Sequence, residues 1–167
     1  TLCVPASAER AVRDPATPLW MRMPAVSPDG TTIAFTYRGK LWVVPVEGGD
    51  ARALTDDGYR ARGPVWAPNS RAVAFSADVV NSGDVYLAPL DGGAISRLTQ
   101  HSRKEWPVAF ASDGAQVLYA SDGVGTPEVT FYDGIGFGAH GPLRAVSVAG
   151  GRSTVAMPLP VREAALS

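Results

Sequence analysis

The stretch that decides the fold is residues 24–55, PAVSPDGTTIAFTYRGKLWVVPVEGGDARALT, because it returns almost position for position about forty residues later. The offset is 40 residues in the front half of the unit and 44 in its back half. A third copy begins at Pro107 and has Asp113-Gly114 in place of Asp29-Gly30. Self-similarity at a period of about 40–45 residues is typical of propeller or solenoid arrays. The pairs that repeat between the first two copies are Pro24 and Pro64, Pro28 and Pro68, Ala34 and Ala74, Phe35 and Phe75, Pro45 and Pro89, Gly48 and Gly92, Gly49 and Gly93, Leu54 and Leu98, and Thr55 and Thr99.

Each copy has the pattern of four short antiparallel strands. In the first copy we expect strands at residues 25–27, 32–37, 41–46 and 51–55, because these segments are rich in strand-forming residues and are bounded by turn residues. Pro28-Asp29-Gly30 fits a tight turn, since proline presets φ and glycine adopts positive φ without strain. Four antiparallel strands in about 40 residues make one propeller blade. The sequence therefore predicts an all-β fold, a partial β-propeller.

Three such blades are predicted, at about residues 20–57, 60–101 and 104–158, followed by the first strand of a fourth at residues 162–167. In the third blade the second and third strands are expected at residues 117–121 and 143–148. Tyr119 and Leu143 lie 24 positions apart, where 6 separate Phe35 from Leu41, so this hairpin carries an insertion of 18 residues. Because closed propellers have four to eight blades, we expect residues 19–167 to be a fragment of a six- or seven-bladed domain. Its open edge favours pairing with further blades or with a second copy of the chain.

The composition excludes several classes of function. The 167 residues hold 15 basic and 16 acidic side chains without a basic cluster, which argues against a nucleic-acid partner. No apolar run approaches the length of about 18 residues needed to span a membrane. Cys3 is the single cysteine, so an internal disulfide and a cysteine-based metal site are excluded. We expect no cofactor.

Residues 1–18 are expected to precede the propeller as a signal-peptide tail and lead-in segment. The chain opens TLCVPASA and continues with Glu9 and Arg10, which resembles the small-residue cleavage end of a secretory signal. This interpretation predicts a periplasmic or secreted protein. An unstructured tail on a cytoplasmic protein is the alternative.

Several residues that suggest chemistry have a simpler structural interpretation. Asp29, Asp91 and Asp113 each lie in a turn sequence, where aspartate hydrogen-bonds to its own backbone. His101 and His140 are not close to a nucleophile motif in the sequence. The glycine-rich run at residues 134–138 is not followed by a helical pattern, as a phosphate-binding loop requires. The sequence therefore predicts no catalytic residue in this chain.

A set of charged residues occupies one position of the repeat. Arg22, Arg62 and Glu105 each stand two positions before the proline of the inner strand, and Arg162 aligns with them in the partial fourth copy. Since the first strand of a blade lies nearest the propeller axis, we expect these side chains to surround one mouth of the channel. Two interpretations stay open: the arginines attract peptide carboxylates or acidic segments, or the residues form a solvated charged rim.

The insertion in the third blade supplies a second set of candidate contacts. Long insertions on a rigid ring are common binding elements. Phe131, Tyr132 and Phe137 are its expected apolar contact points with a peptide.

The repeat resembles the propeller repeat of TolB and of the tricorn proteases. The residues that carry this resemblance are Ser27-Pro28-Asp29-Gly30, Ile33-Ala34-Phe35, Leu41-Trp42-Val43-Val44, Gly48-Gly49 and Leu54-Thr55. Residues 19–22 (LWMR), 39–42 (GKLW) and 98–102 (LTQHS), together with the long insertion, resemble the start of bacterial tricorn-like serine peptidases. Ala111-Ser112 departs from the usual Ser-Pro before Asp113-Gly114, and Asn69-Ser70 departs likewise, both in turns.

The resemblance implies a non-catalytic role for this chain. It implies the propeller portion of an exported tricorn-like serine peptidase, a hydrolase, gating or docking peptides or unfolded protein segments for a catalytic region in the remaining parent chain. A TolB-like periplasmic protein-interaction scaffold is the alternative. The propeller of a prolyl-oligopeptidase-type enzyme is a third interpretation.

Overall fold

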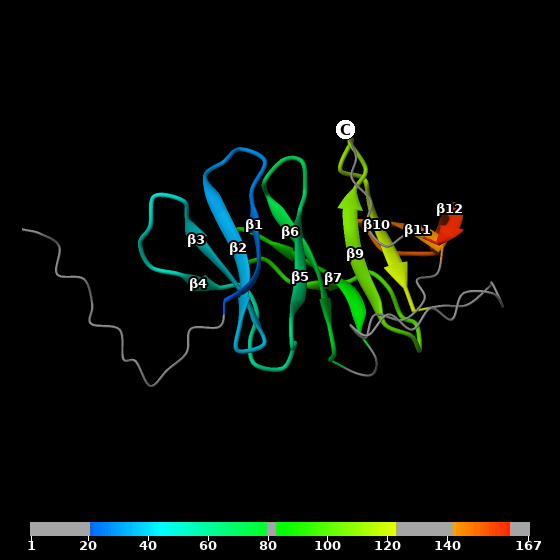
Figure 1. The fold of residues 1–167 in the computed structure, drawn as a ribbon, viewed down its shortest axis with the longest axis horizontal. Coiled ribbons are helices and arrows are strands. Elements are labelled where there is room, and N and C mark those ends of the chain that lie inside the picture. Colours follow the sequence, from blue (N-terminus) through cyan, green and yellow to red (C-terminus); the bar gives the residue numbers. More distant parts are fainter. Residues whose placement is uncertain (1–20, 80–82, 123–141, 161–167) are drawn as a thin grey trace, which may run out of the picture.

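A computed structural model describes residues 21–79, 83–122 and 142–160, the last four of these as backbone only. The described residues form twelve strands in three four-stranded antiparallel sheets, and they contain no helix. The sheets stand side by side like the blades of a fan (Figure 1). The predicted all-β propeller of four-stranded blades is confirmed.

Each sheet is one blade, with its strands in chain order from the inside outward. Blade 1 consists of β1 (Arg22–Val26), β2 (Thr32–Tyr37), β3 (Lys40–Pro45) and β4 (Arg52–Ala53). Blade 2 consists of β5 (Arg62–Trp66), β6 (Ala72–Ala77), β7 (Asp84–Pro89) and β8 (Ser96–Arg97). Blade 3 consists of β9 (Glu105–Phe110), β10 (Gln116–Ser121), β11 (Pro142–Ser147) and β12 (Thr154–Pro160).

The outer strands of blades 1 and 2 are shorter than expected. β4 covers two residues where residues 51–55 were predicted, because the chain leaves the regular ladder after Ala53. The Thr55 hydroxyl accepts a hydrogen bond from the backbone N–H of Leu41 (2.9 Å), and Thr99 does the same for Val85. A side-chain oxygen thus replaces a strand carbonyl at the same place in both repeats.

The aspartates of the turns have the structural role that the sequence predicts. Asp29 accepts hydrogen bonds from the hydroxyl of Ser27 (2.6 Å) and from the backbone N–H of Thr31 (3.0 Å). These bonds, that of Ser27 first, hold the pKa of Asp29 below its ordinary value. Asp91 and Asp113 likewise accept from the backbone N–H two residues further on.

The core lies between the blades, where the face of one sheet packs on the next. The cluster between blades 1 and 2 includes Leu41, Val73 and Phe75, all 0% exposed. The cluster between blades 2 and 3 includes Val85 and Val117, also 0% exposed. The inner strands β1, β5 and β9 are in contact in that order. This arrangement places the starts of the inner strands at the same end of the molecule, beside the β2–β3 turn (Figure 1).

Within the three described ranges, no helix has the length and apolar character that crossing a bilayer requires. The terminal segment at residues 1–18, the insertion residues 123–141 and the fourth-blade residues 162–167 lie outside the described part of the chain.

Candidate functional site

Arg22 and Arg62 occupy the same position in their blades. Arg22 pairs with Thr36 across β1 and β2, and Arg62 pairs with Ser76 across β5 and β6. The register shifts directly after each arginine, so one extra residue of the inner strand bulges out of the ladder. Both side chains are exposed. The sequence alignment of these two residues is therefore correct.

Glu105 does not share this position, which corrects the sequence alignment. β9 has the same register as β1 and β5, since Trp106 pairs with Ala120 as Arg62 pairs with Ser76. Trp106 therefore takes the position of Arg22 and Arg62, and Glu105 lies one residue earlier, opposite Ser121. A displacement of one residue turns a side chain to the opposite face of the sheet. Glu105 is consequently 3% exposed, between blades 2 and 3, and not on a rim. Its counterpart in blade 2 is Ala61: the backbone N–H of Ala61 donates to the Gly39 carbonyl, as that of Glu105 donates to the Gly83 carbonyl.

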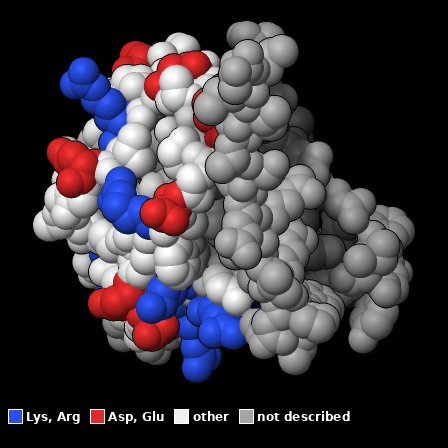
Figure 2. Space-filling model, turned by 90° about the vertical axis from the view of Figure 1, so that its left-hand side faces the viewer, with Lys and Arg blue, Asp and Glu red and all other residues white. Residues whose placement is uncertain are grey.

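An arginine-lined pocket of about 500 Å³ lies where blades 1 and 2 meet at this end of the molecule. We call it the arginine pocket; it is lined by Arg22, Met23, Thr36, Tyr37, Arg38, Gly39, Arg60, Ala61 and Arg62. Lys and Arg side chains gather with acidic ones at the lower end of the face in Figure 2, the end that carries the β2–β3 turn in Figure 1. The start of β1, the β2–β3 turn and the segment before β5 thus bring four guanidinium groups to one cavity.

Contacts with neighbouring side chains position Arg62 and Arg38 at the pocket. Arg62 forms an ion pair with Asp78 (3.3 Å) but keeps 59% of its side chain exposed. The guanidinium of Arg38 lies over the ring of Tyr37, 5.3 Å from its centre. The lining of the pocket includes four arginines and no acidic residue. Guanidinium groups bind carboxylates through two parallel hydrogen bonds, and the pocket is suited to an anionic ligand.

The other predicted contact residues cannot be compared with the structure. Arg162 lies beyond the last described residue, and Phe131, Tyr132 and Phe137 fall within residues 123–141. Their role in binding stays a prediction. His140 falls in the same range.

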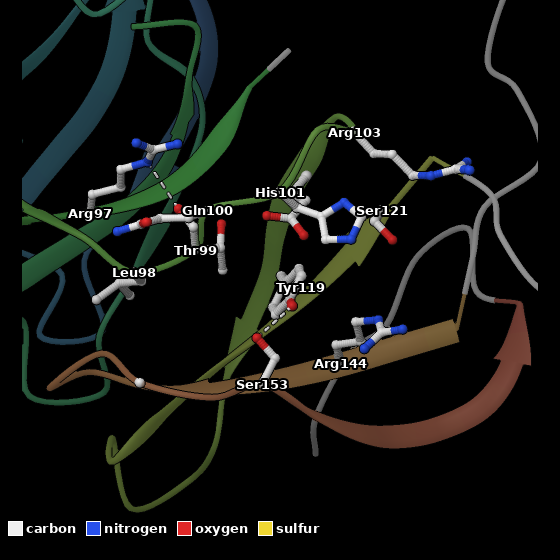
Figure 3. A pocket seen from close by; sticks show the side chains of 12 residues that line it. Arg97, Leu98, Thr99, Gln100, His101, Arg103, Tyr119, Ser121, Arg144 and Ser153 are labelled. Carbon is white, nitrogen blue, oxygen red and sulfur yellow. Dashed lines mark hydrogen bonds between the residues drawn. The ribbon is translucent and has the colours of Figure 1, made fainter. Parts of the chain in front are cut away.

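A second cavity, of about 410 Å³, lies between blades 2 and 3, and we call it the interblade pocket. It is lined by Arg97, Leu98, Thr99, Gln100, His101, Arg103, Glu105, Tyr119, Ser121, Arg144, Gly151 and Ser153. In Figure 3 Arg97 and Thr99 lie on one side, Arg103 and Arg144 on the other, and Tyr119 between them. The Tyr119 hydroxyl donates to the Ser153 hydroxyl (2.8 Å). Unlike the arginine pocket, this cavity is lined by both acidic and basic groups.

Asp84 and Arg97 form an ion pair at one edge of the interblade pocket. Asp84 is 1% exposed, and its Oδ2 accepts from the Arg97 guanidinium at 2.7 Å. Its Oδ1 accepts from the backbone N–H of His101 (3.0 Å), and Arg97 also donates to the Thr99 carbonyl (3.1 Å). The buried carboxylate is thus fully partnered, which identifies this pair as structural.

Glu105 is the buried acid that is not fully partnered. Within the described ranges, no group lies at hydrogen-bond distance from its Oε2. Burial raises the pKa of Glu105 above its ordinary value, and this effect outweighs the opposite effects of the Thr99 hydroxyl, His101 and Arg144. The neighbouring negative charge of Asp84 adds to the increase. The carboxyl therefore holds its proton to a higher pH than an exposed glutamate does.

Glu105→Gln is expected to stabilise the protein at alkaline pH. A carboxyl with a raised folded-state pKa contributes stability that is complete below the unfolded pKa and is lost as pH rises through the folded pKa. Glutamine does not ionise, so the stability of the variant relative to the wild type should rise as the pH increases above the unfolded pKa of glutamate, about 4.3. Urea unfolding across this pH range measures the difference. Glu47→Gln, at an exposed position, is the control, and an equal pH dependence in both variants would contradict the assignment.

The sequence alone did not identify the interblade pocket. The signal was present: at an offset of 44 residues Glu105 aligns with Ala61 and Ser121 with Ala77. Matching the prolines instead, at Pro64 and Pro107, set Glu105 beside Arg62. The structure groups no three His, Cys, Asp or Glu side chains for a metal ion in the part of the chain it describes.

Comparison with known proteins agrees with this architecture. Residues 18–134 match the family model described as the tricorn protease N-terminal beta propeller domain. Tricorn protease homolog 1 of Streptomyces coelicolor is 33% identical over 88 residues, which are 53% of this chain and 8% of that protein. The chain therefore spans a small part of the length of this curated relative.

Solved structures share the fold at low sequence identity. A TolB described as putative, from Agrobacterium tumefaciens, superposes with a TM-score of 0.62 at 17% identity, over 81% of this chain and 48% of that one. The crystal structure of the tricorn protease superposes with a TM-score of 0.51 at 16% identity, over 68% of this chain and 12% of that one. Since the family model covers most of the chain and the described blades have the propeller architecture, the chain belongs to the tricorn protease N-terminal β-propeller family.

Proposed function

We propose that this chain is the non-catalytic propeller portion of an exported tricorn-like serine peptidase, and that its arginine pocket docks carboxylate-bearing peptide segments for a catalytic region elsewhere in the parent chain. The observation that carries the proposal is the convergence of Arg22, Arg38, Arg60 and Arg62 on one cavity at the inner ends of two blades. These residues come from three separate segments, and Arg62 forms an ion pair with Asp78. A cavity with this charge attracts anions and raises their local concentration.

The TolB-like scaffold remains the second candidate, supported by the superposition on the TolB structure over 81% of this chain. In a scaffold the same pocket would bind an acidic segment of a folded partner, without proteolysis. Peptide hydrolysis by the full-length protein separates the two candidates: hydrolysis supports the peptidase, whereas peptide binding without hydrolysis supports the scaffold.

The double variant Arg60→Ala/Arg62→Ala is expected to weaken binding of an acidic peptide about tenfold, or ~1.4 kcal/mol. Each arginine supplies charge-assisted hydrogen bonds to a carboxylate, and exposure limits what each contributes. The measurement is the affinity of the full-length protein for an acidic peptide by fluorescence anisotropy at low and high salt. Arg71→Ala is the matched control, because Arg71 is an exposed arginine at the opposite end of blade 2. Unchanged affinity in the double variant would support the solvated-rim interpretation instead.

The location outside the cytoplasm is part of the same proposal and rests on the sequence of residues 1–10. Cell fractionation with an antibody against residues 24–55 tests it. The parent protein should appear in the periplasmic or secreted fraction. Recovery with cytoplasmic markers would support the alternative location.

A further inference from the structure

The two interblade interfaces have the same backbone but opposite chemistry at one end. Corresponding positions follow from the strand register: Phe75 pairs with Tyr86 in blade 2, as Tyr119 pairs with Arg144 in blade 3. The corresponding pairs, first interface before second, are Tyr59 and Arg103, Ala61 and Glu105, Phe75 and Tyr119, Ala77 and Ser121, Tyr86 and Arg144, and Ile95 and Ser153. Every member of the first set is apolar or aromatic, and every member of the second except Tyr119 is serine or a charged residue.

The interface between blades 1 and 2, which we call the first interface, shows that the fold does not need polar side chains at these positions. Tyr59, Phe75 and Tyr86 pack together with ring centres 5.5–6.0 Å apart. Ala61 and Ala77 are buried against this cluster. The same positions in the second interface surround the 410 Å³ interblade pocket. A packed apolar interface therefore suffices for stability, and the polar set at the second interface needs another explanation.

Glu105 provides an independent sign of a ligand. It is 3% exposed and lines the interblade pocket, and its Oε2 has no hydrogen-bond partner in the described part of the chain. Leaving a buried acceptor unsatisfied costs about 1–3 kcal/mol. Ala61, at the corresponding position of blade 2, has no side-chain acceptor and therefore does not have this cost. A donor from outside the chain would satisfy the carboxylate.

We propose that the interblade pocket binds the amino end of a peptide, with the α-ammonium group donating to Glu105 and a neighbouring peptide carbonyl accepting from Arg144. An ammonium group is a strong donor to a buried carboxylate, because the hydrogen bond is charge-assisted. Arg144 is half-buried and lines the same pocket, and arginine provides donors for a carbonyl.

The surrounding charges favour this ligand over a metal ion or an anion. His101, Arg103 and Arg144 line the pocket together with a single partly unsatisfied carboxyl, and Asp84 is already paired with Arg97. A divalent cation would have one available carboxylate and would face the guanidinium groups, whereas it prefers several oxygen ligands. A simple anion would lie next to the carboxyl group of Glu105, which disfavours a second negative charge. A ligand with one positive group beside a hydrogen-bond acceptor matches both the carboxyl group of Glu105 and the guanidinium group of Arg144.

This inference goes beyond the proposed function, because it concerns a different cavity and holds whether or not the arginine pocket binds carboxylates. The test is isothermal titration calorimetry on the full-length protein at pH 7.5 with three probes. These are trialanine amide, which has a free α-ammonium group, its N-acetylated form, and Nα-acetyl-lysine amide, which offers an ammonium group on a side chain. We expect saturable binding of trialanine amide and at least tenfold weaker binding of the other two.

Two variants at one position keep the test independent of folding defects. Glu105→Ala installs the residue that blade 2 has at Ala61, and Glu105→Gln preserves the shape of the side chain. Both should weaken binding of trialanine amide at least tenfold while thermal unfolding stays at or above the wild-type temperature. Arg144→Tyr, which installs the counterpart Tyr86, should weaken binding as well.

The double variant Arg60→Ala/Arg62→Ala should bind trialanine amide unchanged, which separates this inference from the arginine pocket. Equal binding of the acetylated peptide, no measurable binding by the wild type, or full binding by Glu105→Ala would overturn the proposal. Tighter binding of the lysine derivative would overturn the assignment to a peptide amino end.

Discussion

Arg97→Met is expected to destabilise blade 2 by about 3–5 kcal/mol, because it leaves the carboxylate of Asp84 buried without its cation. Asp84 is 1% exposed, and the 2.7 Å bond from Arg97 is its charged contact. Methionine preserves much of the length of the side chain but donates no hydrogen bond. Hydrogen exchange measured by mass spectrometry on the full-length protein should show faster exchange in peptides covering β7 and β8.

The double variant Asp84→Asn/Arg97→Met is the control for this prediction. Asparagine keeps an oxygen that can accept from the backbone N–H of His101 while it removes the charge. We expect the double variant to recover part of the lost protection, since no uncompensated charge remains. A loss below about 1 kcal/mol in Arg97→Met would contradict the structural role of the pair and place it among weak surface ion pairs.

Phe75→Ala is expected to cost about 3–5 kcal/mol, the usual range for removing a large buried aromatic side chain. Phe75 is 0% exposed at the centre of the first interface, and its ring lies 5.8 Å from that of Tyr86 and 6.0 Å from that of Tyr59. The cavity left by the ring would be lined by both blades, so the contact between them should weaken. Exchange should therefore accelerate in β2 and β3 as well as in β6.

Val79→Ala is the matched control for the core substitution. Val79 follows the same strand but is 45% exposed, so truncation there removes little buried surface. Its exchange pattern should match the wild type. If Phe75→Ala accelerated exchange in β6 alone, the two blades would not be coupled through this ring.

The two interfaces illustrate how one repeat serves stability and binding at once. The apolar cluster around Phe75 joins blades 1 and 2, while blades 2 and 3 retain an apolar core around Val85 and Val117 and replace one end of it with polar groups. Replacing apolar side chains by polar ones lowers the stability of this interface, and a bound ligand could restore that stability. The expected gain in stability for Glu105→Gln follows from the same reasoning.

The sequence by itself determined the fold and its local chemistry. The repeat of residues 24–55, the turn residues and the strand-forming residues of segments such as β2 predict four-stranded blades, because these signals are local and depend on backbone preference. The same holds for Asp29, whose hydrogen bonds reach only neighbouring residues. It also holds for the equivalence of Arg22 and Arg62, since the repeat places them at identical points of their blades.

Only the tertiary structure decided which side chains share a cavity. Arg38 and Arg60 join the arginine pocket because the β2–β3 turn of one blade meets the segment that enters the next, a contact between residues that the sequence does not pair. Glu105 is buried because Trp106, one residue later, pairs at the position of Arg22 and Arg62, and one residue of register decides which face of a strand a side chain occupies. Neither the pairing of an inner strand nor the packing of one blade on another follows from local preference, because both depend on contacts between residues far apart in the chain.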